Sequence, residues 1–228
     1  PIDIIKSCNF TQPYYAHFIE KIHSKYSFFN KTVAEIGSDY NLECSYAVTL
    51  LGAKEVVAIN DWHADTPVPP SITFLHSKFE KAILPDEKFD LIFAIAVLEH
   101  INNPIIFANT LVKKLKKGGH AFIQGTPMWT SSVGHHLYVM DGKYNFTDST
   151  NILDDWYHLT YPTQDDFKVY LSEKNVPLDD IPHIWDYVYN SPNISRYSPS
   201  EIISIFKSTK GITVNAERQY DEIKPTNK

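Results

Sequence analysis

An almost unbroken apolar run from Phe89 to Val97 is the feature that most restricts the fold of this chain. A strand with one exposed face alternates apolar and polar side chains, whereas a strand buried on both faces is apolar throughout. The run is also far shorter than the roughly 20 apolar residues that a membrane-spanning helix needs. It therefore predicts a central strand of a parallel sheet, and no membrane segment.

Strand and helix signals alternate through the first two-thirds of the chain, as is typical of a parallel α/β sheet. Strands are predicted at residues 32–36, 55–59, 72–75, 89–97, 120–124 and 212–216. Helices are predicted at 11–29, from 41 to Gly52, and from Asn103-Pro104 to Gly118-Gly119, where asparagine caps the start and glycine marks the end. We expect a single domain, 1–228, with a Rossmann-like, doubly wound, mostly parallel sheet.

The alternation breaks after the fifth strand, and residues 126–197 carry three of the four tryptophans. A long stretch without βαβ pattern is usually functional, so we expect an aromatic-rich insertion that acts as a lid or substrate wall. The alternative is that its aromatic side chains form a satellite core. Ser198 and Glu201 then resemble a capping box ahead of a short helix.

Composition excludes some partners. The formal net charge is −6 and no basic stripe is present, which argues against a dedicated nucleic-acid binder. Cys8 and Cys44 are the only cysteines and form no CxxC motif, so a cytoplasmic protein is expected.

The segment T-V-A-E-I-G-S-D-Y-N (32–41) has the pattern of a strand that turns into a helix at a cofactor loop. Glu35 and Asp39 flank Gly37, and two carboxylates would repel the pyrophosphate of a dinucleotide. They would suit a ligand that carries positive charge. Asp39 and Asn41 stand where dinucleotide loops have glycine, and both residue types tolerate left-handed backbone.

The chain resembles the class I S-adenosylmethionine-dependent methyltransferases, particularly the small bacterial type (type 11/12-like). The resemblance lies in Glu35-Ile36-Gly37, in F-D-L-I through V-L-E-H-I (89–101), and in L-K-K-G-G (115–119). These motifs occur in the family's order and spacing over residues 32–125. The resemblance implies methyl transfer from S-adenosylmethionine, with S-adenosylhomocysteine as product.

The resemblance also implies the cofactor contacts. Glu35, Gly37 and Asp39 would hold the methionine end, and Asp61 with Asn60 would bind the ribose. Lys78 replaces an acid of the family, so the adenine contact is expected from Phe79. The turn after the fourth strand, with Ala94 and Ala96, would line the pocket.

The acceptor needs a base if it is an oxygen nucleophile, and histidine suits that role near neutral pH. His136 or His135 is the first candidate and His158 the second, although a histidine among aromatic residues is more often a packing residue. On a strand, the two adjacent histidines would point in opposite directions. Substrate contacts are predicted from side chains at the rim after the fourth strand and in the insertion: Glu99, His100, Trp129, Tyr138, Trp156 and Tyr157.

Asp154-Asp155 and the histidines could instead bind a divalent ion, but no spaced set of ligands accompanies these acids, so no metal is expected. Similarity to methyltransferases of bacterial surface-polysaccharide pathways favours a small-molecule or glycan acceptor, such as a sugar hydroxyl or a nucleotide-activated metabolite. The alternative is a non-catalytic binding or assembly protein on the same fold. A nicotinamide-dependent enzyme is disfavoured by the acids around Gly37.

Overall fold

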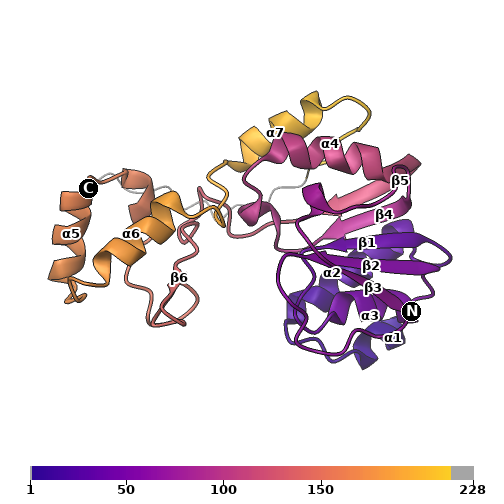
Figure 1. Ribbon diagram of the computed structural model, residues 1–228, viewed down its shortest axis with the longest axis horizontal. Coiled ribbons are helices and arrows are strands. Elements are labelled where there is room, and N and C mark those ends of the chain that lie inside the picture. Colours follow the sequence, from indigo (N-terminus) through magenta and orange to yellow (C-terminus); the bar gives the residue numbers. More distant parts are fainter. Residues whose placement is uncertain (1, 217–228) are drawn as a thin grey trace. The chain divides into compact units, whose positions relative to one another are not determined.

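The computed structural model describes residues 2–216, and these form two compact units (Figure 1). Among them, unit 1 consists of residues 2–97, 103–125 and 208–212. Unit 2 consists of 98–102, 126–207 and 213–216. The segment predicted as a lid, 126–197, lies in unit 2.

Unit 1 is built on a five-stranded parallel sheet in the order β3-β2-β1-β4-β5 (Figure 1). Ala34 in the middle of β1 is paired with Val57 on one side and Ile92 on the other. The strands are β1 (Thr32–Ile36), β2 (Glu55–Asn60), β3 (Ile72–His76), β4 (Phe89–Ala94) and β5 (Leu115–Ile123). The strand order reverses between β1 and β4, and ligands of open α/β sheets bind at the carboxyl ends of strands at such a point.

Helices flank this sheet, which confirms the predicted fold class. Side chains of a strand alternate between its two faces, so only some residues of each strand enter a given core. One core cluster contains residues of α2, of α3 and its start, and of the strands: Ile19, Ile22, Leu42, Ala47, Val48, Val33 and Phe93. The helical elements of unit 1 are α1 (Ile2–Ser7), α2 (Pro13–Tyr26), α3 (Glu43–Leu50), η1 (Phe79–Lys81) and α4 (Pro104–Lys114).

Strand β4 carries the apolar run that predicted a central strand, and its residues are almost all fully buried. The N-cap of α4 is also as predicted, because Asn103 Oδ1 accepts a hydrogen bond from Ile106 N at 3.0 Å. The apolar residues of α3 and α4 are not all buried. Tyr46, Leu50 and Ile105 are 47%, 43% and 55% exposed, since Cys44, Val48 and Phe107 take the inward positions instead.

The end of α4 differs from the prediction. Gly118 and Gly119 do not terminate the helix but lie inside β5, which begins directly at Leu115. A bulge explains their presence: the register shifts between Phe89 and Leu91, and Gly118 has a φ of +78°. The predicted strand at 212–216 is wrong, because these residues have no strand partner in the described part of the chain.

Unit 2 is mainly helical and has its own aromatic core. Trp129, Phe167, Ile184 and Val188 are among its buried residues, and Trp185 and Tyr189 pack against them. The alternative that the insertion forms a satellite core is thus confirmed. Its elements are η2 (Leu98–His100), β6 (Tyr138–Val139), β7 (Tyr144–Asn145), η3 (Tyr157–Thr160), α5 (Gln164–Glu173), α6 (Ile181–Asn190) and α7 (Pro199–Ser208).

Capping boxes start two helices of unit 2. Ser198 Oγ and Glu201 exchange hydrogen bonds with each other's backbone N–H, as predicted, and Thr163 and Asp166 do the same for α5. No helix within residues 2–216 is long and apolar enough to cross a membrane.

Candidate functional site

The turn between β1 and α3 accepts only glycine at residue 37. Gly37 has a φ of +68°, and a Cβ added there would lie 2.5 Å from Val97 Cγ2. Its N–H donates to Ile59 O at 2.8 Å, which ties the turn to the end of β2. The turn therefore passes tightly against the loop that follows β4, at the switch point of the sheet.

Asp39 caps the first turn of α3. Its carboxylate accepts hydrogen bonds from the backbone N–H groups of Asn41 at 2.8 Å and Glu43 at 3.0 Å. Neither Asp39 nor Asn41 uses the left-handed backbone that its residue type tolerates; Leu42 is left-handed instead, with a φ of +58°. Since a carboxylate of the chain itself already occupies the helix N-terminus, the turn has no open anion site for a pyrophosphate.

Glu35 is buried beside this turn and accepts a hydrogen bond from Ser45 Oγ at 2.5 Å. Burial and the nearby charge of Asp39 raise the pKa of Glu35 to about 8. Single ligand atoms of Glu35, Asp39 and Cys44 lie within 4.8 Å of one another. Ser38 Oγ is buried and has no hydrogen-bond partner among the described residues. The turn thus offers two acids, Glu35 and Asp39, and the Ser38 hydroxyl to a ligand that carries positive charge and polar groups.

The end of β2 carries the two residues predicted to bind ribose. Asn60 Nδ2 donates to Ser38 O, and Asn60 Oδ1 accepts from Trp62 N at 3.3 Å, so this side chain braces two loops. The Asp61 side chain is 41% exposed and lies 3.5 Å from Lys78 Nζ. The lysine that replaces a family acid therefore pairs with the remaining one.

The other predicted cofactor residues have different surroundings. The Phe79 ring is 3% exposed and packs against Phe107, with centroids 5.6 Å apart, so it belongs to the core. Ala94 ends β4 and is fully buried, and Ala96 has a φ of +56°.

Gln124 holds the loop after β4, and the sequence analysis missed it. Its Oε1 accepts from Ala96 N at 2.8 Å, its backbone O accepts from Val97 N at 3.2 Å, and its own N–H donates to Ala94 O at 2.9 Å. A polar residue at the carboxyl end of a predicted strand was the signal that could have identified it.

The three candidate histidines of unit 2 are buried, and their partners define their tautomers. They lie in turns and a short 3₁₀ helix. The expectation that His135 and His136 point in opposite directions applied only to a strand. His136 Nδ1 lies 2.9 Å from Gly134 O and must donate to it, which leaves a lone pair on Nε2. His158 Nε2 similarly donates to Trp129 O at 2.7 Å. His135 Nδ1 instead accepts from Leu137 N at 3.1 Å, so its Nε2 carries the proton.

Burial keeps these imidazoles neutral. It lowers the pKa of His135 to about 3 and that of His136 to about 4, and it also lowers the pKa of His158. Nε2 of His136 and Nδ1 of His158 have no hydrogen-bond partner among the described residues. His136 is thus a neutral histidine with a free lone pair, whereas His135 has none to offer.

Glu99 and His100 come together with His136. One ligand atom from each of the three side chains lies within 4.8 Å of the others. Glu99 is 2% exposed and burial raises its pKa to about 8. His100 is exposed, and its Nδ1 donates to Asn193 O at 2.7 Å.

The predicted aromatic contacts are mostly core residues. Trp129 is 2% exposed and donates from Nε1 to the Tyr161 hydroxyl at 3.1 Å. Tyr157 stacks on Tyr170 with ring centroids 3.6 Å apart. Trp156 and Tyr157 are half-buried and Tyr138 is 53% exposed, so Tyr138 keeps the most surface for a ligand.

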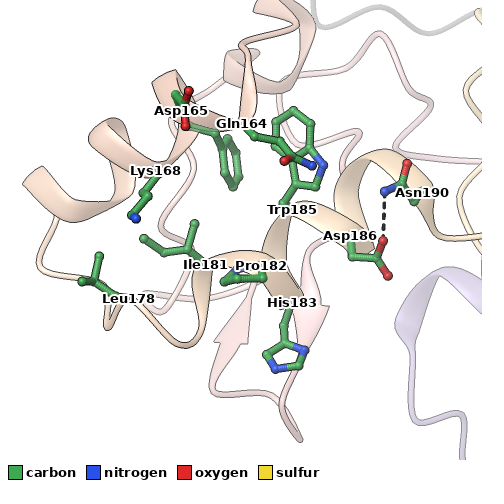
Figure 2. Close-up of a pocket in the computed structure, with 11 residues that line it drawn as sticks. Gln164, Asp165, Lys168, Leu178, Ile181, Pro182, His183, Trp185, Asp186 and Asn190 are labelled. Atoms are coloured by element: carbon green, nitrogen blue, oxygen red, sulfur yellow. Dashed lines mark hydrogen bonds between the residues drawn. The ribbon is translucent and has the colours of Figure 1, made fainter.

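A groove of about 540 Å³ runs over α5 and α6 in unit 2 (Figure 2). Trp185, Lys168 and His183 line it, together with Asp186, which accepts a hydrogen bond from Asn190 Nδ2 at 2.9 Å. None of the residues predicted for the acceptor site lines this groove.

Comparison with known proteins decides the family. Residues 15–208 match the model of a family described as "Methyltransferase domain". The chain belongs to the methyltransferase domain family. This confirms the predicted class I methyltransferase family and its cofactor, S-adenosylmethionine. No curated protein is significantly similar to this methyltransferase in sequence.

Several solved structures resemble parts of this methyltransferase. A Listeria monocytogenes protein provisionally classed as an S-adenosylmethionine-dependent methyltransferase is 19% identical over 56% of this chain and 62% of its own, with a TM-score of 0.45. A Bacillus halodurans protein provisionally classed as a methyltransferase is 12% identical over 83% of this chain and 66% of its own, with a TM-score of 0.48.

A third structure contains S-adenosylhomocysteine, the demethylated form of S-adenosylmethionine. The Burkholderia thailandensis 1,6-didemethyltoxoflavin-N1-methyltransferase, with bound S-adenosylhomocysteine, is 13% identical over 50% of this chain and 52% of its own, with a TM-score of 0.40. The matched part thus spans less than two thirds of the Listeria and Burkholderia chains.

The β1–α3 turn of this methyltransferase fits the cofactor in its chemistry. S-adenosylmethionine carries a sulfonium and an ammonium group, and Glu35 and Asp39 supply carboxylates that lack a cationic partner among their hydrogen bonds. The glycine that a Cβ could not replace permits close approach of the backbone. The exposed Asp61 is free to exchange its surface ion pair with Lys78 for a ligand hydroxyl.

Proposed function

We propose that this methyltransferase transfers the methyl group of S-adenosylmethionine to a hydroxyl oxygen of a sugar or another small polar metabolite, including nucleotide-activated forms. The observation that supports an oxygen acceptor is the neutral, buried His136, whose Nε2 lone pair has no partner among the described residues. An alcohol must lose its proton as it attacks, and a positioned neutral histidine can take that proton.

The cofactor side of the proposal uses unit 1. When bound, S-adenosylmethionine supplies a methyl carbon on a positively charged sulfur. Glu35 and Asp39 would hold its cationic groups, and the backbone at Gly37 would contact its methionine part. Asp61, braced by the neighbouring Asn60, would accept hydrogen bonds from the ribose hydroxyls. Ala94 and Ala96 would line the pocket, with Gln124 fixing the loop that carries Ala96.

The acceptor side uses unit 2, which includes the predicted lid 126–197. Bound S-adenosylmethionine would supply the methyl group, and His136 Nε2 would take the proton of the acceptor hydroxyl. The pKa of about 4 keeps this nitrogen unprotonated at neutral pH. Glu99, with a pKa raised to about 8, is protonated there and can donate a hydrogen bond to the acceptor.

The other histidines are weaker candidates for the base. His135 Nε2 carries a proton and has no lone pair to accept another. His158 has a free Nδ1, but the residue is fully buried and its ring packs edge-on against Trp129 at 4.7 Å. We therefore assign the base to His136 and a packing role to the other two.

The sugar acceptor and a surface-polysaccharide pathway rest on sequence resemblance. A cytoplasmic location rests on the two free cysteines, Cys8 and Cys44. A non-catalytic binding protein on the same fold is the second candidate. The pairing of Lys78 with Asp61 favours it, because that contact occupies the acid expected to bind ribose.

Calorimetric titration with S-adenosylhomocysteine, with NAD as control, tests the cofactor side. Micromolar binding of the first compound alone supports the proposal, whereas indifference of that binding to Gly37→Val would contradict the assigned loop. A screen of sugars and nucleotide sugars for methyl transfer tests the acceptor side. His136→Gln should lower turnover by about 10²- to 10⁴-fold while S-adenosylhomocysteine binding stays unchanged.

A further inference from the structure

The cluster of Glu99, His100 and His136 has the composition of a metal site. Its three ligand atoms, from one carboxylate and two imidazoles, lie within 4.8 Å of one another in unit 2. We propose that these three side chains bind a single divalent transition-metal ion, with Zn²⁺ the best match. The catalytic consequence drawn below rests on the proposed function, but the binding of the ion does not.

Both histidines are already oriented as metal ligands. His100 Nδ1 donates to Asn193 O at 2.7 Å, and His136 Nδ1 donates to Gly134 O at 2.9 Å. Each hydrogen bond fixes the ring and leaves Nε2 with a free lone pair. A backbone carbonyl that holds the second ring nitrogen is the usual support of a metal-binding histidine. The rings lie 5.3 Å apart, at an angle of 62°.

Two of the three side chains carry a buried polar atom that has no hydrogen-bond partner among the described residues. Glu99 is 2% and His136 5% exposed, and neither Glu99 Oε2 nor His136 Nε2 has a hydrogen-bond partner among the described residues. Leaving a buried polar atom without a hydrogen-bond partner is unfavourable. A shared cation would satisfy both at once, which explains why the fold tolerates them side by side.

The donor set selects the kind of ion. Two imidazoles and one carboxylate suit Zn²⁺ and neighbouring first-row ions, whereas Mg²⁺ and Ca²⁺ prefer sites made of oxygen. Zinc with three protein ligands keeps a fourth position for water or substrate. Ligands on tetrahedral zinc are about 3.3 Å apart, given Zn–N bonds of about 2.0–2.1 Å. Of the three side chains, the exposed His100 has the most freedom to adjust to that spacing.

Such an ion would change how the acceptor is activated. In the metal-free scheme the His136 lone pair takes the hydroxyl proton, whereas with the ion bound it is a ligand. An acceptor hydroxyl at the open position would then lose its proton to solvent, because a Zn²⁺ ion lowers the pKa of an oxygen that it contacts. The sequence missed this site because its ligands stand 36 positions apart, at 99–100 and 136, outside any short spacing motif.

The test is a titration of the EDTA-treated full chain with Zn²⁺ by calorimetry, and with Co²⁺ by its visible absorption. We expect one ion per chain, with a dissociation constant below about 1 μM and the intense absorption of tetrahedral cobalt. His100→Ala removes an exposed ligand without opening the core and should weaken binding at least about tenfold. Glu99→Gln should do the same.

His183→Ala is the matched control, because it removes an exposed histidine of unit 2 that lines the α5–α6 groove. A second pair, His63 and His76 in unit 1, has ring centroids 4.1 Å apart, so the titration is repeated with His63→Ala to remove binding there. Absent binding, or binding that His100→Ala and Glu99→Gln leave unchanged, overturns the inference.

Two further measurements separate this inference from the proposed function. S-adenosylhomocysteine binding is measured in the same EDTA-treated protein, and methyl transfer is assayed with and without Zn²⁺. Methyl transfer at full rate in EDTA would refute the catalytic role of the ion and leave the proposed function standing, whereas the titration alone decides whether the ion binds. Stoichiometric binding without methyl transfer to any hydroxyl acceptor would support the site and refute the acceptor class.

Discussion

Replacing Gly37 by alanine should destabilise the turn between β1 and α3, and two separate contributions to the loss in the free energy of unfolding can be distinguished. The first is the backbone: an L-residue at a φ of +68° costs about 1–2 kcal/mol. The second is steric: the new Cβ would lie 2.5 Å from Val97 Cγ2, and forcing an extra carbon into a packed contact costs about 1–3 kcal/mol. Together they predict a loss of about 2–5 kcal/mol in the free energy of unfolding.

Gly118→Ala isolates the backbone part. Gly118 has a φ of +78°, and an added Cβ would meet nothing within 4 Å, so this variant should lose only about 1–2 kcal/mol. Val97→Ala in the Gly37→Ala background removes the methyl group that clashes, and it should recover the steric part but not the backbone part. Urea unfolding of the four proteins (the three variants and wild type) gives these differences.

Cofactor affinity separates the turn from general stability. Gly37→Ala should weaken S-adenosylhomocysteine binding, measured by calorimetry, and Val97→Ala should restore part of it, while Gly118→Ala leaves it unchanged. The reasoning is refuted if Gly37→Ala costs no more stability than Gly118→Ala. It is also refuted if Gly37→Ala binds S-adenosylhomocysteine as tightly as Gly118→Ala and wild type do.

Three more predictions concern unit 1. Because the pKa of Glu35 is raised, its contribution to the free energy of unfolding without ligand is fully present below about pH 4.5 and is lost as pH rises through about 8. Glu35→Gln should therefore flatten this part of the stability–pH profile. Because a cation favours the ionised acid, S-adenosylmethionine binding should release protons at pH 7, which calorimetry in two buffers of different ionisation enthalpy would detect; equal heats would count against the assignment. Asp39→Ala should cost about 0.5–2 kcal/mol in urea unfolding through loss of the α3 cap, with Asp65→Ala as a surface control. Lys78→Ala should tighten S-adenosylhomocysteine binding by freeing Asp61, and weaker binding would show that the lysine itself contacts the ligand.

The sheet could be predicted from sequence because each strand carries its own local signal. The apolar run at 89–97 and the caps at Asn103 and Ser198 depend only on neighbouring residues, and the structure has these elements where the sequence placed them. Gly118-Gly119 was misread because a helix end and a β-bulge both use glycine at positive φ. The distinction depends on Phe89 and Leu91, which pair with the strand from another part of the chain.

The candidate site was predictable only in part for the same reason. Gly37 and Asp39 were identified because the residues that define the turn are adjacent in sequence. The tautomers of His135 and His136 depend on carbonyl and amide groups that the fold brings to them, and no spacing rule gives those. Trp129 and Tyr157 were assigned to substrate because a stacking surface and an aromatic core have the same composition.

The way in which the chain enters unit 2 restricts how its specificity could change. Residues 98–102 belong to unit 2, although they lie between β4 and α4 of unit 1 in the sequence, and Ser195 N donates to Glu99 O at 2.7 Å. A recombination event that exchanged only the segment 126–207 would replace His136 but keep Glu99 and His100 of the parent. An exchange that keeps the three side chains matched must therefore include residues 98–102 together with 126–207.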